Sequence, residues 1–127
     1  MRDLMLVGLG GFMGAVARYL VSGATHLVLG RPAFPFGTLV VNVVGSFVLG
    51  FLFHLGESRG VIGPGFRNFV FVGVIGAFTT FSTFSLETVN LLVAGDRSFG
   101  LINIIVNVVG CLGAIVLSRY LVTAIWG

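Results

Sequence analysis

The sequence predicts an all-α membrane protein with four transmembrane helices and no separate soluble domain. Of its 127 residues, 57% are hydrophobic and 9% are charged, whereas a soluble domain carries about 25% charged residues. Four apolar stretches each reach the roughly 20 residues that a helix needs to cross the hydrocarbon core. These stretches are residues 4–29, 34–55, 66–94 and 99–126. The alternation typical of transmembrane barrel strands does not occur, so we expect one four-helix domain over residues 1–127.

The first apolar stretch, residues 4–29, is expected to be a retained span and not a cleaved signal peptide. Arg2 ahead of an apolar run is typical of a signal peptide, but Arg18 interrupts the run and no small-residue cleavage site follows. Gly10 and Gly14 form a small-xxx-small pair, which lets helix backbones approach closely in lipid. The chain has 20 glycines, which favours close packing within one subunit or between copies.

Polar side chains at every fourth position form a stripe on the second and the fourth span. The stripes are Thr38, Asn42 and Ser46 on the second span, and Asn103, Asn107 and Cys111 on the fourth. An amide side chain has several donors and acceptors to satisfy, so these stripes either line an aqueous path or join helices to one another. Cys111 is the only cysteine, and it is either a small buried hydrophobic residue or a reactive thiol.

The third span contains the most unusual segment, residues 76–85, in which five hydroxyl side chains are interleaved with three phenylalanines. Polar side chains at membrane depth are costly and usually face protein or water. Two groups lie on adjacent helical faces: Thr80, Thr83 and Glu87, and beside them Phe81 and Phe84. This segment is therefore the first candidate for the functional site.

The connections between the spans are short and carry few charges. Turn-forming residues interrupt the apolar pattern at 30–33, 56–65 and 95–98. The side of the membrane that holds the N-terminus receives Arg2, Arg59 and Arg67, with Arg119 near its edge, and the opposite side receives Arg31 and Arg97. Orientation depends on a bias in such counts, and this bias is weak. Either a small chain has few loops to carry charge, or molecules insert in both orientations and pair antiparallel.

The polar groups inside the spans favour an anion as the solute of an aqueous path. Aromatic rings have a positive edge, amides and hydroxyls offer donors, and Arg18 adds a cation within the first span. Arg18 either raises the anion concentration in a vestibule or has a structural pairing with backbone carbonyls. A cation path would be lined by rings of Asp or Glu, and here only Glu87 is a candidate. A small anion that accepts strong hydrogen bonds fits best.

Three segments carry a resemblance to a known family. They are Gly-Gly-Phe-Met-Gly-Ala-Val-Ala-Arg-Tyr at 10–19, Gly-Thr-Leu-Val-Val-Asn-Val-Val-Gly-Ser-Phe at 37–47, and Gly-Ala-Phe-Thr-Thr-Phe-Ser-Thr-Phe-Ser-Leu-Glu at 76–87. Because it has these three segments in this order, the chain resembles the small bacterial fluoride channels, the Fluc or CrcB family. The resemblance implies an antiparallel dual-topology homodimer in the cytoplasmic membrane of a prokaryote. It also implies two pores per dimer that passively export fluoride and so lower its cytoplasmic concentration.

The resemblance also implies roles for individual residues. Asn42 would be the amide donor of the pore, and the ring edges of Phe81 and Phe84 would contact the ion. Thr80, Thr83 and Glu87 would belong to a polar track beside them. The polar stripes add Thr38, Ser46 and Asn107 as expected lining residues, and the charge of Arg18 suggests a place in the vestibule. The family often has hydroxyl side chains on the pore face of the fourth span, where this chain has Asn103, Asn107 and Cys111. A helix break at 76–79 would free the carbonyls of Gly76 and Thr79 for a structural sodium ion at the dimer axis.

Two other classes remain as alternatives. A small multidrug exporter is also a short four-span dimer, but those proteins resemble one another in a buried Glu of the first span, where this chain has Arg18. A non-transporting membrane assembly protein would leave the Asn and Thr stripes unexplained. An enzyme is not expected, because the sequence has no nucleophile–base pair, metal cluster or phosphate loop. A nucleic-acid partner is not expected either. His26 and His54 lie near span ends and are expected to be interfacial residues.

Overall fold

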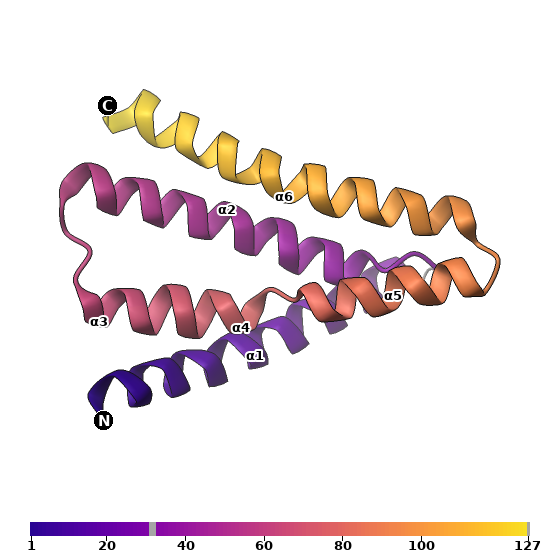
Figure 1. Cartoon of the computed structure of the whole chain (residues 1–127), viewed down its shortest axis with the longest axis horizontal. Helices are drawn as coiled ribbons and strands as arrows, with labels where there is room; N and C mark the ends of the chain where they lie inside the picture. The colour runs from indigo at the N-terminus through magenta and orange to yellow at the C-terminus, as the bar shows by residue number, and fades with distance from the viewer. Residues whose placement is uncertain (31–32, 127) are drawn as a thin grey trace.

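The chain forms four long helical segments, and no strand occurs in the described part. The computed structural model describes residues 1–30 and 33–126. Its elements are α1 (Arg2–Leu29), α2 (Phe36–Arg59), α3 (Pro64–Phe66), the π-helix η1 (Arg67–Ile75), α4 (Gly76–Phe78), α5 (Phe81–Val93) and α6 (Arg97–Trp126). Figure 1 shows that α3, η1, α4 and α5 follow one another along a single bent segment.

Four helical segments are long and apolar enough to cross a membrane. They are Arg2–Leu29, Phe36–Arg59, Pro64–Val93 and Arg97–Trp126. The prediction of an all-helical chain with four membrane-length helices is therefore confirmed, with bounds that differ from the predicted ones by at most four residues. Arg31 and Pro32, which belong to the first predicted connection, lie outside the described residues.

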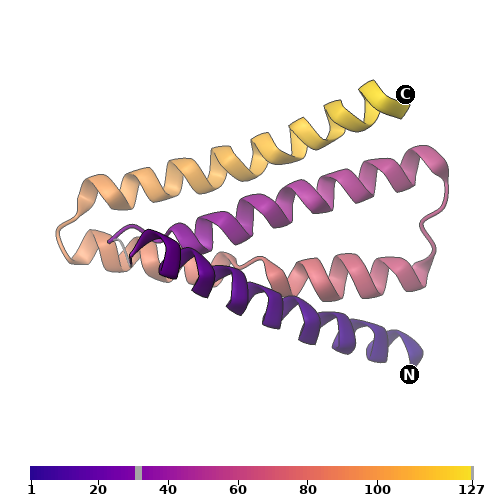
Figure 2. The same ribbon diagram turned by 180° about the vertical axis from the view of Figure 1, so that it is seen from behind.

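The helices run up and down, so both chain ends lie at one end of the molecule (Figure 1). The connection between α2 and α3 lies at this same end, and the connection between α5 and α6 lies at the other. α2 packs along α6, whereas α1 packs along η1 and α4. Viewed from behind, α1 crosses in front of the bent third segment (Figure 2). The third segment therefore packs on α1 through η1 and α4 and on α6 through α5, while α1 also packs directly on α2.

The contact between α1 and the third segment brings two backbones together. A Cβ added at Gly10 would collide with the carbonyl oxygen of Phe69, and one at Gly73 would lie 2.9 Å from the Cα of Gly10. A Cβ at Gly14 would likewise collide with the carbonyl of Val74. Gly11 has nothing within 4 Å, so it lies on the outer face of α1. The small-xxx-small pair of the sequence is thus used for packing within this chain.

The third segment loses its helical conformation between α4 and α5. Thr79 is extended, with ψ 157°, and Thr80 is extended too, with φ −151° and ψ 111°. The predicted interruption covered residues 76–79, but Gly76 is itself helical, with φ −60° and ψ −35°. The extended residues are therefore Thr79 and Thr80, later than the glycine that was expected to begin the break. Segment η1, which is separated from the break by the short helix α4, is a π-helix, a form that recurs at functional sites.

The side-chain interior is small and unusually polar. Large apolar side chains cover the outside of all four segments, as in Leu9, Phe12, Val72 and Leu112. Residues less than 9% exposed include seven polar ones: Thr38, Asn42, Thr80, Thr88, Asn103, Asn107 and Ser118. Apolar surface at this scale is expected to face lipid or another protein chain. The buried polar residues are therefore the candidates for a functional site.

Candidate functional site

One side chain of α2 holds the extended residues of the third segment. The Oδ1 atom of Asn42 accepts the backbone N–H of Thr80 at 2.8 Å, and its Nδ2 donates to the Thr80 carbonyl at 3.2 Å. Asn42 is 8% exposed, so these bonds form in the interior, where an unpaired backbone group would cost about 1–3 kcal/mol. The Asn42 amide therefore replaces the helical acceptor that the Thr80 N–H has lost, and it also binds the Thr80 carbonyl.

The same amide begins a chain of hydrogen bonds that joins α2, α6 and α5. Asn42 Nδ2 also donates to Asn107 Oδ1 at 3.1 Å, and Asn107 Nδ2 donates to Asn103 Oδ1 at 2.9 Å. Asn103 Nδ2 in turn donates to Thr88 Oγ1 at 2.9 Å, and Thr88 donates to the Phe84 carbonyl at 2.7 Å. The polar stripes predicted on the second and fourth spans thus meet inside the molecule. In this state both contacts of the Asn42 amide nitrogen are to protein acceptors.

Thr80 also caps the helix that follows it. Its Oγ1 accepts the backbone N–H of Thr83 at 3.2 Å, which is the bond of a typical N-cap residue. The same hydroxyl donates to Thr83 Oγ1 at 3.0 Å and lies 3.2 Å from Ser82 Oγ. The interleaved hydroxyls of the sequence therefore serve a helix start, with Thr80 buried and Thr83 exposed.

The interruption removes helical donors from two carbonyls. In a continuous α-helix the N–H of Thr80 would bond to the Gly76 carbonyl, but here it bonds to Asn42. The N–H of Thr83 would reach the Thr79 carbonyl, but here it bonds to the Thr80 hydroxyl. The carbonyl oxygens of Gly76 and Thr79 are thereby left without these partners. They are the two groups that the sequence comparison with fluoride channels assigned to a cation.

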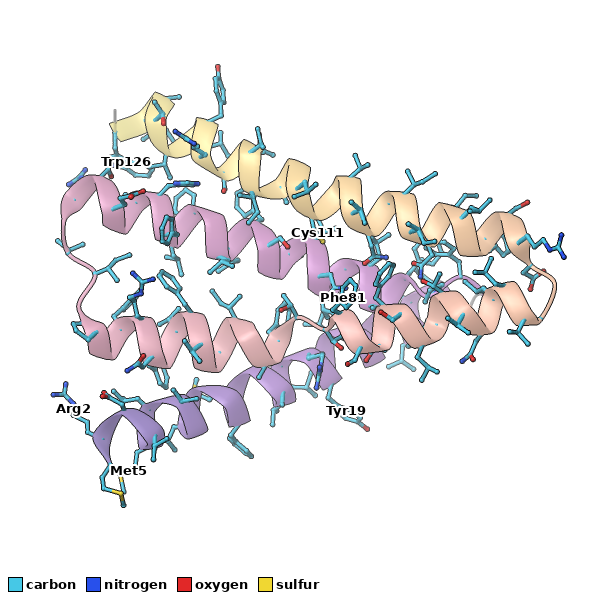
Figure 3. The ribbon with its side chains drawn as sticks, in the orientation of Figure 1. Arg2, Met5, Tyr19, Phe81, Cys111 and Trp126 are labelled. Carbon is cyan, nitrogen blue, oxygen red and sulfur yellow. The ribbon has the colours of Figure 1, made fainter. Side chains whose placement is uncertain are left out.

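A pocket of about 360 Å³ opens beside the extended residues, between α2, α5 and α6. Its lining residues are Asn42, Gly45, Ser46, Leu49, Thr79, Thr80, Phe81, Phe84, Asn107, Val108, Cys111 and Leu112. Gly45 allows this arrangement, because a Cβ there would collide with the Thr79 methyl group. Figure 3 shows Phe81 and Cys111 facing the same space. Amides, hydroxyls and aromatic rings are therefore collected on one small surface.

The two predicted aromatic residues are adjacent but differ in exposure. The ring centroids of Phe81 and Phe84 are 5.4 Å apart and the rings are inclined by 53°. Phe84 is buried at 7% exposure, whereas Phe81 is 77% exposed. The ring of Phe81 therefore forms an open wall of the pocket, where another molecule can cover it.

A second pocket, of about 440 Å³, lies on the other side of Thr80. It lies between α1, α2 and α5 and is lined by Ala15, Arg18, Tyr19, Ser22, Gly23, His26, Thr38, Val41, Thr80 and Thr83. Arg18 is half-buried here. The predicted vestibule cation thus shares a cavity with Thr38, Thr80 and Thr83, whereas Asn107 and Ser46 line only the first pocket. Thr80 belongs to both.

Thr38 connects this second cavity to Glu87 of α5. The Thr38 hydroxyl donates to Glu87 Oε1 at 2.8 Å, while Glu87 Oε2 is buried without a hydrogen-bond partner among the described residues. A buried carboxylate oxygen without a partner is unusual in folded proteins. The predicted face of Thr80, Thr83 and Glu87 is therefore divided, because Glu87 lies against α2 and away from the Phe81 pocket.

Sequence reasoning missed three polar residues of this region. Thr88 ends the amide chain, and Ser22 and His26 line the second pocket. Thr88 follows Phe84 by four positions, so helical spacing alone contained a signal for it. Ser22 and His26 follow Arg18 at steps of four residues, so helical spacing contained a signal for them too. Only tertiary packing places this face of α1 against α2.

Comparisons with known proteins agree with one another. A family model described as CrcB-like protein, Camphor Resistance (CrcB), matches residues 5–119. A protein of Magnetococcus marinus is 51% identical over 115 residues, which cover 91% of this chain and 89% of the relative. A protein of Methanococcus maripaludis is 44% identical over 129 residues, covering 99% and 100%, and one of Shewanella baltica is 47% identical over 122 residues, covering 96% and 97%. All three relatives bear the name fluoride-specific ion channel FluC.

Proposed function

This chain belongs to the CrcB-like protein family, and we propose that it is a fluoride-selective channel that lets fluoride leave the cytoplasm passively. Relatives 44–51% identical over most of the chain are named fluoride-specific ion channels. They are channels and not enzymes, in agreement with the sequence prediction. The function rests on one structural observation: an extended break in a membrane span, flanked by a pocket of amides, hydroxyls and phenylalanines.

Selectivity follows from how fluoride exchanges its water for these groups. Fluoride is small and strongly hydrated, so it enters a narrow path only where fixed donors and positive ring edges replace its water. The hydroxyls of Ser46 and Thr83 and the edges of Phe81 and Phe84 supply such groups. Asn42 contributes when fluoride, itself an acceptor, competes with Asn107 Oδ1 for its N–H. Chloride is larger and accepts weaker hydrogen bonds, so it is not compensated for its dehydration.

The polar track continues from the first pocket to the second through Thr80, which lines both. On the far side the track comprises Thr83, Thr38 and Glu87, with Arg18 at its outer part as the cation that attracts anions. Because the two pockets lie on opposite sides of the extended residues, an anion moving between them passes the buried Thr80 hydroxyl.

We further propose that the working unit is an antiparallel homodimer in the inner membrane with two such pores. The 77% exposed ring of Phe81 is an incomplete wall, and a second copy would close it. Gly11 and Gly8, which have nothing within 4 Å, offer α1 a face for close approach to another helix. The weak arginine bias between the two sides is compatible with insertion in both orientations.

A structural sodium ion would fit the freed carbonyls. Gly76 and Thr79 lack their helical donors, because Asn42 and Thr80 have taken those N–H groups. Carbonyl oxygens suit a hard monovalent cation, and two antiparallel copies would bring two such pairs to the dimer axis. The ion would supply positive charge that balances these dipoles and holds the two breaks together.

Fluoride efflux from liposomes that contain the purified protein tests the proposal. Efflux read with a fluoride electrode is expected to exceed chloride efflux from matched liposomes by more than about 100-fold. Phe81→Ile should greatly slow the fluoride flux while the dimer stays assembled. Equal rates of fluoride and chloride efflux from the liposomes, or an unaltered fluoride flux in Phe81→Ile, would overturn the pore assignment. Proton-coupled uptake of aromatic cations would instead indicate a small multidrug exporter.

A further inference from the structure

His26 lines the second pocket. It occupies the last turn of α1, is half-buried, and lines the cavity of about 440 Å³ together with Arg18 and Ser22. Thr38 and Thr83 face it across the cavity from α2 and α5. An imidazole is thus placed in the same space as the hydroxyls of the proposed fluoride path.

The position of the ring is fixed by the start of α2. A Cβ added at Gly37 would lie 3.3 Å from His26 Nε2 and 2.5 Å from Ser22 Oγ. The absence of a side chain at Gly37 therefore lets the histidine ring rest against the backbone of α2, one residue before Thr38.

The charged neighbours of His26 come from two elements. Arg18 and the titratable Tyr19 line the same cavity from α1, and the Glu87 carboxylate of α5 accepts the hydroxyl of Thr38, which also lines it. α2 presents Gly37 and Thr38 there, which carry no charge. One cation and one carboxylate therefore lie at this cavity, and a positive charge on the His26 ring would make its net charge positive.

We propose that His26 is a proton-controlled anion attractor, which raises the occupancy of this vestibule by fluoride when it is protonated. The inference rests on the proposed function, since it requires that fluoride pass Thr80 and Thr83. A histidine side chain changes charge between about pH 5 and 8. As the pH falls, the imidazolium adds to the field of Arg18 and offsets the repulsion of an anion by Glu87. Fluoride entry should therefore increase at acid pH and decrease at alkaline pH.

Fluoride current across a planar bilayer at constant fluoride concentration measures this effect. Current is the right quantity, because neutral hydrogen fluoride crosses membranes without carrying charge. One unit charge at this range should change the wild-type current about two- to threefold between about pH 8 and about pH 5.5. His26→Gln should remove the dependence. His54→Gln, which changes the only other histidine in a separate pocket at the ends of α2 and α6, should keep it.

A second variant places a permanent positive charge at position 26. His26→Lys should hold the current near the acid level of the wild type at both pH values. If His26→Gln gives no current, His26→Lys decides: a flat profile supports the proposal and a wild-type pH response overturns it. A wild type that conducts fluoride with no pH dependence, or a His26→Gln variant that keeps the wild-type dependence, overturns this inference alone. A wild type without fluoride current at either pH overturns the proposed function, and this inference with it.

Discussion

The two sides of the bent third segment are held by opposite means. On one side α1 meets η1 backbone to backbone, through Gly10, Gly14 and Gly73, with no side chain between them. On the other side α2 and α6 reach the segment with amide side chains, and Asn42 and Asn103 hydrogen-bond to Thr80 and Thr88 beside a pocket. The first contact leaves no space and fixes the position of the segment, whereas the second leaves space and lines it with polar groups.

The two contacts should differ in the substitutions that they tolerate. A contact between backbones cannot accept even one added carbon atom, because neither side can move away. A contact between amides tolerates changes of shape but not changes of donor into acceptor, because each group would then face another of its own kind. Four substitutions, ordered from the largest expected effect to the smallest, separate these two behaviours.

Asn42→Asp should have the largest effect, on transport. The carboxylate would place an oxygen against the Thr80 carbonyl and against Asn107 Oδ1, which both now accept from the amide nitrogen. It would also repel fluoride. We expect fluoride efflux from liposomes to fall by at least about 100-fold, while the dimer still assembles. Asn90→Asp is the matched control, since Asn90 is exposed on α5 and its variant should conduct normally. Normal flux in Asn42→Asp would show that this amide is not needed.

Gly10→Ala should break the contact between α1 and the third segment. The new Cβ would collide with the Phe69 carbonyl, and overpacking of this kind costs about 1–3 kcal/mol. Gly113→Ala is the matched control on α6, where an added Cβ would meet nothing within 4 Å, and its better helix propensity should make it neutral or slightly stabilising. Thermal unfolding of the two variants in detergent measures the difference. Equal stabilities would mean that the backbones are not in close contact.

Asn103→Ala should weaken the amide side without closing the pocket. Asn103 is fully buried and connects Asn107 to Thr88, so its removal leaves buried polar groups unpaired at a cost of about 1–3 kcal/mol. Asn103 does not line the first pocket, and fluoride flux should fall less than in Asn42→Asp. Unfolding in detergent and efflux from liposomes, measured on the same preparation, test both parts. A stable variant without flux would place Asn103 in the path itself.

Thr80→Ala should have the smallest effect on stability. It removes the oxygen that caps α5 at the Thr83 N–H, which is worth about 1 kcal/mol. Thr80→Ser keeps the oxygen and should unfold at nearly the wild-type temperature. Because Thr80 lines both pockets, the alanine variant should also slow fluoride efflux more than the serine variant does. Identical efflux from the two would remove the Thr80 hydroxyl from the proposed path.

The sequence was a good guide to everything that depends on helical spacing. It placed the four spans, and it put Asn42 and Asn107 on polar faces of their helices. It did not say that these faces meet, because the spacing within one helix carries no information about the rotation of another. The break was expected to begin at Gly76, since glycine favours irregular backbone. The extended residues are instead Thr79 and Thr80, where the Asn42 amide and the Thr80 hydroxyl compensate the lost bonds.

His26 illustrates the same limit on the functional side. Its place near the end of a hydrophobic stretch suggested an interfacial residue, which is where histidines often lie. Helical spacing puts His26 on the same face of α1 as Arg18, but only the approach of α1 to α2 at Gly37 makes that face line a cavity with Thr83. That contact depends on the absence of a side chain at Gly37, which a reading of one span at a time cannot detect.

The bonds between Asn42 and Thr80 have a consequence for which sequences can build this fold. One side-chain amide satisfies both backbone groups of a single residue, as a neighbouring β-strand would do in a sheet. Among the genetically encoded side chains, only Asn and Gln end in a planar group with a donor beside an acceptor. Gln is one methylene longer and would push the extended residues away from α2. The Asn42 side chain thus makes the pair of backbone hydrogen bonds that a neighbouring strand would make, and few other residues at position 42 can form both.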